Sequence, residues 1–215
     1  MVHEGEPSVA HVLTIAQQKG GSGKTTLAVN LAVALTRAGH RVAVLDTDPQ
    51  GSLGRWFMAR REAGIEDMDF GTASAWGVGY EISKLAKTSD FVIVDTPPKV
   101  DSDLRPALRE SDLVLVPVAT SQVDLWAVDS VLDLADRVGR PTMIVLNRFK
   151  SGTRVSEEID TALAEMGASR AKSVLGNRVV YVETLGQGRG VQERGKGAWS
   201  DEVEALCNEI LGTLT

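Results

Sequence analysis

The chain has 215 residues, of which 43% are hydrophobic and 24% charged, and its formal net charge is −6. This composition is typical of a globular protein and excludes intrinsic disorder. The single cysteine, Cys207, excludes an internal disulfide and a cluster held by several thiolates of one chain. The sequence has no run of about 20 apolar residues that predicts a membrane span, and residues 1–9 lack the apolar core of a signal peptide. We therefore expect a cytoplasmic protein that does not bind membranes.

Short apolar runs alternate with longer helical patterns along the chain. The expected strands are rich in β-branched residues and lie at residues 9–16, 41–45, 68–70, 91–94, 113–118 and 143–146. The expected helices have apolar residues three and four positions apart and cover residues 25–37, 123–138, 155–166 and 199–214. Gly39 ends the first of these helices, and Ser121 with Asp124 forms a capping pattern before the second.

Most of the expected strands are continuously apolar rather than alternating, which is typical of strands buried on both faces of a sheet. We predict an α/β fold of the P-loop type, in which a mostly parallel sheet has helices on both faces. One such domain accounts for residues 1–215.

A glycine-rich loop, KGGSGKTT at residues 19–26, lies between the first strand and the first helix. Glycines allow the backbone to turn back and direct several N–H groups at one anion, and the helix adds the positive end of its dipole. Lys24 can reach the outer phosphates of a nucleotide, and the Thr25 hydroxyl is placed to bind Mg²⁺. The loop therefore predicts a nucleotide-binding site.

The loop departs from the general pattern at its start. Gln18 stands where the first glycine is usual, and Lys19 is a second lysine five residues before Lys24. This form resembles the deviant Walker A motif of the ParA/MinD family of ATPases. The resemblance implies ATP and Mg²⁺ as cofactors, and it implies that Lys19 reaches the nucleotide held by a partner subunit. The loop residues expected at the nucleotide are Lys19, Gly20, Gly21, Ser22, Gly23, Lys24, Thr25 and Thr26.

Carboxylates follow two of the expected strands. Asp46 and Asp48 share one side of the chain if it stays extended, and Asp95 ends an apolar strand in the Walker B arrangement. Residues 46–51 resemble switch I of the family, which implies that Asp48 orients the attacking water and that Asp46 lies near the metal. The resemblance also implies that Asp95 holds Mg²⁺ through a water. The expected catalytic residues are thus Lys19, Lys24 and Asp48, and the expected metal site comprises Thr25, Asp46 and Asp95.

Three later segments complete the resemblance. Residues 96–103 resemble switch II, and Asn147 ends a strand at the place where the family commonly uses an asparagine to read adenine. An ordinary cap at a strand end is the alternative explanation for Asn147. Residues 177–183 loosely resemble the segment that borders the adenine pocket, although the proline often seen there is missing.

Features that the sequence lacks separate the branches of the family. Cys207 lies in the last helical pattern and cannot form the cluster of the nitrogenase iron protein. Residues 201–209 are acidic, whereas MinD proteins end in a basic amphipathic helix that binds membranes. Only about ten residues precede the first strand, so we do not expect the DNA-reading domain that large plasmid ParA proteins carry there.

The resemblance therefore implies a short ParA-like ATPase. Such a protein forms a homodimer with ATP, hydrolyses it slowly and positions a plasmid, a chromosome or a protein cluster. A ParB-like or cargo-adaptor protein would stimulate the hydrolysis. A MinD-like regulator that cycles on a membrane and an ATP-dependent amidating enzyme or synthetase are the alternatives.

The charge is distributed unevenly along the chain. Residues 170–196 carry a local net charge of +4, whereas the rest of the chain carries −10. We expect this segment to bind DNA without sequence preference, which predicts association with the nucleoid. The candidate contacts are Arg170, Lys172, Arg178, Arg189, Arg194 and Lys196.

Overall fold

A computed structural model describes residues 10–98, 104–119 and 121–215. Its six strands form one sheet in the order β3-β2-β4-β1-β5-β6, and every pair of neighbouring strands is parallel. The strands are β1 (His11–Ile15), β2 (Val42–Asp46), β3 (Asp69–Thr72), β4 (Phe91–Asp95), β5 (Leu113–Ala119) and β6 (Thr142–Asn147). Predictions for residue 9 and for residues 99–103 of switch II lie outside the described residues.

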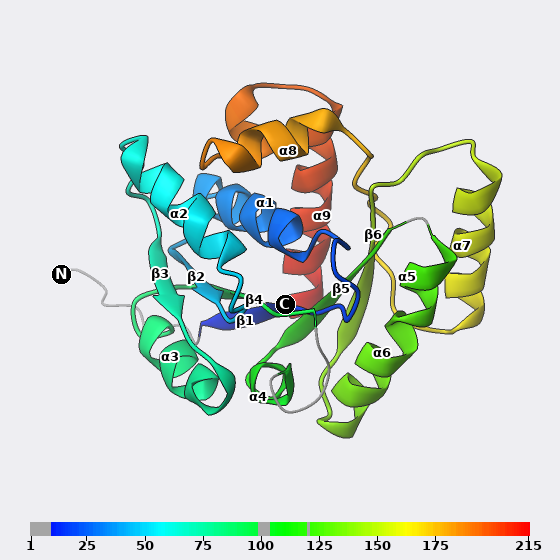
Figure 1. Ribbon diagram of the computed structural model, residues 1–215, viewed down its shortest axis with the longest axis horizontal. Helices are drawn as coiled ribbons and strands as arrows, with labels where there is room; N and C mark the ends of the chain where they lie inside the picture. Colours follow the sequence, from blue (N-terminus) through cyan, green and yellow to red (C-terminus); the bar gives the residue numbers. More distant parts are fainter. Residues whose placement is uncertain (1–9, 99–103, 120) are drawn as a thin grey trace.

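Helices connect the strands and cover both faces of the sheet (Figure 1). Three buried side-chain clusters place α1, α2, α8 and α9 on one face, and α3, α4, α6 and α7 on the other. The helices are α1 (Lys24–Arg37), α2 (Ser52–Glu62), α3 (Val78–Leu85), α4 (Leu104–Arg109), α5 (Gln122–Trp126), α6 (Val128–Arg137), α7 (Arg154–Glu165), α8 (Val179–Gly186) and α9 (Ala198–Leu214), with 3₁₀ turns η1 (Ala75–Gly77) and η2 (Val191–Arg194).

The packing explains why apolar and polar residues do not alternate along the strands. In β1, Leu13 and Ile15 pack in the cluster that contains α1 and α9, whereas Val12 packs on the opposite face with α3. Both faces of the central strands are therefore apolar, which confirms the predicted fold class.

The strand register places acidic side chains side by side at the carboxyl ends. Asp46 at the end of β2 pairs with Asp95 at the end of β4, and Ile15 of β1 pairs with the same aspartate. The phosphate loop leaves β1 at this edge, where parallel α/β sheets bind ligands.

One predicted helix is divided in the structure, and the structure contains several helices that the sequence patterns did not predict. The helix expected at residues 123–138 is two helices, because α5 ends at Trp126 and α6 begins again at Val128. Asp124 of α5 accepts a hydrogen bond from Lys19 of the phosphate loop, whereas Val128 and Val131 of α6 are buried in the core. Helices α2, α3, α4 and α8 were not predicted.

Among the helices that the structure describes, none combines the length and the apolar composition of a membrane span.

Candidate functional site

The glycine-rich loop turns at two residues with positive φ. Gly21 has φ +78° and Gly23 has φ +92°, a region that side chains with a Cβ rarely adopt. A Cβ on Gly23 would lie 2.2 Å from Asn147 Nδ2, so close packing also requires glycine there. Helix α1 starts at the next residue, Lys24, and directs its unsatisfied N–H groups toward the loop. The loop and the helix N-terminus together form an anion-binding cradle.

Lys24 is 7% exposed, and its Nζ donates to the Gln17 carbonyl oxygen at 3.0 Å. Desolvation lowers the pKa of this lysine, while the nearby carboxylates of Asp95 and Asp48 act in the opposite direction. The ammonium group is thus held at the start of the loop, within the cradle.

Asp95 is the most buried acid of the site. It is 1% exposed, and its Oδ2 accepts a hydrogen bond of 2.6 Å from Thr25 Oγ1. Burial raises the pKa of Asp95 to about 7. Its Oδ1 is buried and has no hydrogen-bond partner among the described residues. A hydroxyl and a carboxylate with an unused oxygen are ligands that fit Mg²⁺, directly or through water.

The two aspartates of residues 46–51 lie in different environments. Asp46 is 4% exposed and accepts from the backbone N–H of Gly54 at 2.8 Å and of Asp48 at 3.0 Å, and desolvation raises its pKa. Asp48 is half-buried, and its Oδ1 accepts from the Gln50 N–H at 2.9 Å. A hollow of about 500 Å³ is lined by both acids and by Pro49, Gly51, Gly54, Thr72, Ala73 and Ser74.

Asn147 connects the loop to a second hollow. Its Nδ2 donates to the Ser22 carbonyl oxygen at 3.0 Å, and its Oδ1 accepts from the Arg148 N–H at 2.9 Å. A pocket of about 340 Å³ adjoins the loop and is lined by Thr26, Asn147, Arg148, Gly176, Asn177, Arg178, Tyr181 and Val182. This pocket joins the two segments that the sequence related to adenine.

The structure places Lys19 against its own chain. Its Nζ lies 2.6 Å from Asp124 Oδ2 and 3.2 Å from Ser121 Oγ at the start of α5. The Lys19 side chain is 34% exposed, whereas that of Asp124 is 2% exposed. The predicted capping contact is also present, since Ser121 Oγ accepts from the Asp124 N–H at 3.2 Å. The capping turn therefore also holds the lysine.

The six basic candidates of residues 170–196 do not form one uniform surface. Three have acidic partners within the chain, namely Arg170 with Asp160, Arg178 with Glu202 at 2.6 Å and Arg194 with Glu183 at 3.7 Å. Within residues 10–98, 104–119 and 121–215, no ion pair involves the other three, Lys172, Arg189 and Lys196.

Sequence reasoning missed Arg60, which fixes part of this segment. Arg60 on α2 is 1% exposed and pairs with Asp67 at 2.6 Å and with Glu193 at 2.9 Å. Its Nη1 also donates to the Gly188 carbonyl oxygen at 3.0 Å. In the sequence, nothing distinguishes it from the neighbouring Arg61, which is exposed.

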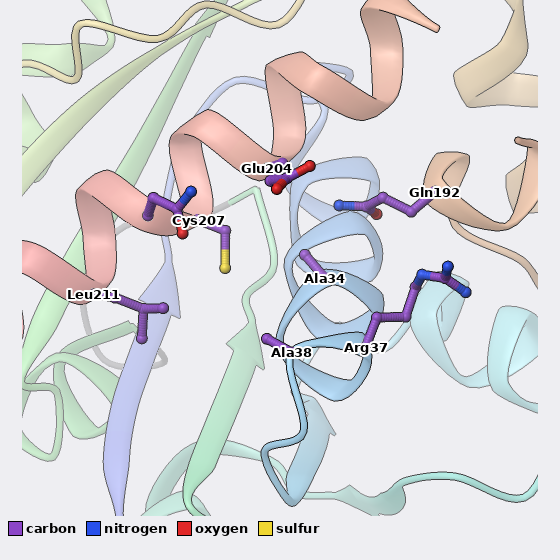
Figure 2. Close-up of a pocket in the computed structure, with 8 residues that line it drawn as sticks. Ala34, Arg37, Ala38, Gln192, Glu204, Cys207 and Leu211 are labelled. Carbon is purple, nitrogen blue, oxygen red and sulfur yellow. The ribbon is translucent and has the colours of Figure 1, made fainter. Parts of the chain in front are cut away.

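A separate cavity of about 260 Å³ lies between α1, η2 and α9 (Figure 2). Ala34, Arg37 and Ala38 line it from the end of α1, and Cys207 lines it from α9. A helix of this length places the cavity roughly 20 Å from the loop, so it is not part of the nucleotide site. Burial raises the pKa of the Cys207 thiol to about 11, which favours the protonated form of the thiol at neutral pH.

Comparison with known sequences identifies the family to which such a phosphate loop and sheet belong. Residues 13–188 match the model of the CobQ/CobB/MinD/ParA nucleotide-binding domain. Maintenance of carboxysome distribution protein A of Halothiobacillus neapolitanus is 31% identical over 215 residues, covering 94% of this chain and 97% of that relative. Chromosome partitioning protein ParA of Caulobacter vibrioides is 31% identical over 169 residues, covering 60% and 62% of the two chains.

Solved structures share the fold at low sequence identity. A plasmid partition protein from Borrelia burgdorferi bound to AMPPNP superposes with a TM-score of 0.82 at 18% identity, covering 95% of this chain and 99% of that one. MinD from Pyrococcus horikoshii with Mg-ADP gives 0.78 at 18% identity, covering 96% and 99%. Because the family model spans most of the sequence and one relative aligns over nearly its whole length, this chain belongs to the CobQ/CobB/MinD/ParA family of nucleotide-binding proteins.

Proposed function

We propose that this protein is a ParA-like ATPase that forms a dimer with ATP and Mg²⁺, binds DNA without sequence preference and positions a cargo. The observation that supports it best is the convergence of Lys24, Thr25 and three aspartates at one sheet edge, with a second lysine, Lys19, at the start of the loop. A cargo role agrees with the names of the relatives, which concern carboxysome distribution and chromosome partitioning.

Each side chain has a place in the proposed reaction. The N–H groups of the loop and Lys24 bind the phosphates, and Thr25 with Asp95 and Asp46 would hold the metal. Bound Mg²⁺ would neutralise charge on the phosphates during transfer. Asp48 is half-buried beside the acidic hollow, and we assign it the task of orienting the attacking water. Asn147 and the adjoining pocket would take the adenine.

Lys19 links nucleotide binding to assembly in this proposal. In the single chain it is bound to Asp124 and Ser121. We propose that it leaves these partners in the dimer and contacts the nucleotide of the other subunit. ATP would thereby favour the dimer, and hydrolysis would favour its separation.

The DNA-binding face is proposed to centre on residues 189–196. Arg189 and Lys196 belong to this segment, which Arg60 fixes to α2 through Gly188 and Glu193. The arginines already paired with carboxylates would contribute less to phosphate binding, because those partners compete with the DNA. Lys172 lies outside this segment and is the third candidate.

The main test is retention of the protein on non-specific duplex DNA with ATP or ADP at increasing salt. We expect retention with ATP only, falling steeply with salt. The variants Arg189→Ala and Lys196→Ala should each lower the slope of log affinity against log salt by about one, whereas Lys87→Ala, an exposed residue after α3, should not. DNA binding that is absent or independent of ATP would contradict the proposal.

Dimer formation is tested separately by sedimentation. Lys19→Ala and Lys24→Ala should remove the ATP-dependent dimer, whereas Asp48→Ala should retain the dimer with unhydrolysed ATP. Normal hydrolysis by Asp48→Ala would show that the assignment of Asp48 is wrong.

Membrane cycling of the MinD type is the alternative function. The apolar side of α9 is packed in the core through Val203, Leu206 and Ile210, and Asp201 and Glu204 are on its exposed side. This helix therefore has no free apolar face with which to enter a lipid surface. Sedimentation with anionic liposomes and ATP should leave the protein in the supernatant, and co-sedimentation would favour the alternative.

A further inference from the structure

Two aromatic side chains stand out from the surface at η1 and the start of α3. Trp76 is 93% exposed and Tyr80 is 76% exposed. Tryptophan and tyrosine are enriched among the residues that contribute most to binding at protein interfaces. They lie four residues apart on consecutive helical turns, so both belong to one side of the chain.

The backbone that presents Trp76 is strained. Ala75, which precedes it, has φ +42°, a left-handed conformation that costs free energy for a residue with a Cβ. The left-handed conformation of Ala75 lowers the stability of the single chain, and the exposed indole contributes almost no burial that would offset it. Such features persist where the exposed side chain has a use.

A pocket lies beside Trp76 and continues onto α4. Its volume is about 310 Å³, and its lining residues are Trp76, Gly79, Arg105, Pro106, Arg109 and Glu110. Helices α3 and α4 pack together on the same face of the sheet (Figure 1). Leu104, Ala107 and Leu108 of α4 are buried, which leaves its arginines on the outer side.

The pocket is mainly but not wholly basic. Within the described ranges, no ion pair involves Arg105 or Arg109. Arg140 donates to the Arg109 carbonyl oxygen and adds a third guanidinium nearby. Glu110 lies over Gly79, where a Cβ would be 3.4 Å from its carboxylate oxygen.

This combination favours a peptide over a nucleic acid. Carboxylates of an acidic segment can pair with the arginines, and a large apolar side chain can pack on Trp76 and Pro106. The Glu110 carboxylate can accept from peptide N–H groups, which the backbone of a nucleic acid does not have. A folded partner that offers one such segment satisfies all three chemistries.

We propose that Trp76, Tyr80, Arg105 and Arg109 form a docking surface for an acidic segment of another protein with one large apolar anchor residue. The inference goes beyond the ATPase function and does not depend on DNA binding or on dimer formation. The surface lies between two segments that lead to the site, since Thr72, Ala73 and Ser74 line the hollow of Asp48 and α4 comes after β4, which ends at Asp95.

The test selects peptides from a displayed library of random 12-residue sequences on the full-length protein. Selected peptides are then labelled with fluorescein, and their affinity is measured by polarisation. We expect sequences with several Asp or Glu residues around one aromatic or aliphatic residue. Trp76→Ser and Arg109→Glu should each weaken their binding about tenfold or more, as for a central interface residue.

Trp126→Ser is the matched control, because Trp126 on α5 is also a highly exposed tryptophan, at 71%. It should leave the peptide affinity unchanged, and Trp76→Ser should leave ATP hydrolysis and the thermal midpoint unchanged. The proposal is overturned if no peptide is selected, if the selected peptides are not acidic, or if they bind Trp76→Ser equally well. It is also overturned if Trp76 is needed instead for single-stranded DNA binding or for self-association in sedimentation.

Discussion

The ion pair between Lys19 and Asp124 gives a quantitative prediction about dimer formation. If Lys19 has to leave Asp124 to reach a second subunit, the free energy of that contact opposes the dimer. Replacing the acid by the amide of the same size, Asp124→Asn, keeps a hydrogen bond from the Lys19 ammonium to the amide oxygen and removes the attraction between opposite charges. The variant should therefore dimerise more strongly with ATP.

The magnitude follows from the exposure of the two groups. Asp124 is buried and Lys19 is about one-third exposed, so the contact is a charge-assisted hydrogen bond that is partly screened by water. Such bonds contribute about 1.5–3 kcal/mol, and we assign the loss of the acceptor's charge about 1 kcal/mol within that range. A difference of about 1 kcal/mol in each subunit gives about 2 kcal/mol for the dimer, which corresponds to an approximately thirtyfold lower Kd.

Sedimentation velocity with AMPPNP and Mg²⁺ measures this Kd without hydrolysis. Asp133→Asn removes an exposed acid from the neighbouring α6 and should leave the Kd unchanged. Asp124→Asn should also lower the free energy of unfolding in urea, by about 1 kcal/mol, since the charged contact is lost. An unchanged or higher Kd for Asp124→Asn, with the expected loss of stability, would refute the idea that Lys19 exchanges partners.

Three further predictions concern the loop, the metal site and the buried arginine. Gly23→Ala should lose at least about 2 kcal/mol of stability and should no longer bind ATP, because φ is +92° and the added Cβ meets the Asn147 side chain. Gly20→Ala is the control, because a Cβ at Gly20 meets only open space, and its thermal melt should be that of a normally folded protein. Burial raises the pKa of Asp95 to about 7, so between about pH 4 and pH 7 the folded metal-free protein keeps a proton that the unfolded chain releases. The free energy of unfolding in urea should therefore decrease as the pH rises from about 4 to about 7. Asp95→Asn should make this decrease smaller. Arg60→Met should cost about 3–5 kcal/mol in the same assay because it leaves two carboxylates without their partner, whereas Arg61→Met should change stability by no more than about 1 kcal/mol.

The fold could be predicted because its signals are local and strong. Strands β2 and β4 are apolar at every position before their terminal aspartate, as expected of strands buried on both faces. The phosphate loop is a contiguous segment whose glycines have a direct conformational role. Helix α2 was missed because only Leu53, Trp56 and Arg60 of its residues are buried, which is too few for a clear apolar stripe.

The parts of the site that could not be predicted depend on contacts between distant residues. Lys19 and Asp124 are 105 residues apart, and Arg60 and Glu193 are 133 apart. No periodicity or spacing records such a pair, and one buried arginine looks like its exposed neighbour in the sequence. The same limit applies to the basic segment, where local charge could be counted but its neutralisation by Asp160, Glu183 and Glu202 could not.

The charges of the site predict that ATP binding depends on a bound cation. Asp48 and Asp95 act electrostatically on one ammonium group, Lys24, and Asp46 lies beside Asp95. Asp46 and Asp95 already have raised pKa values. A nucleotide without a cation would add further negative charge to this group and would be repelled. Asp95 Oδ1 has no hydrogen-bond partner in the part of the chain that the structure describes, and a cation at this oxygen lowers the energy of the site most directly. We therefore expect ATP binding to require Mg²⁺, with affinity for ATP in excess EDTA far below that for Mg-ATP, and we expect Asp95→Asn to reduce this dependence.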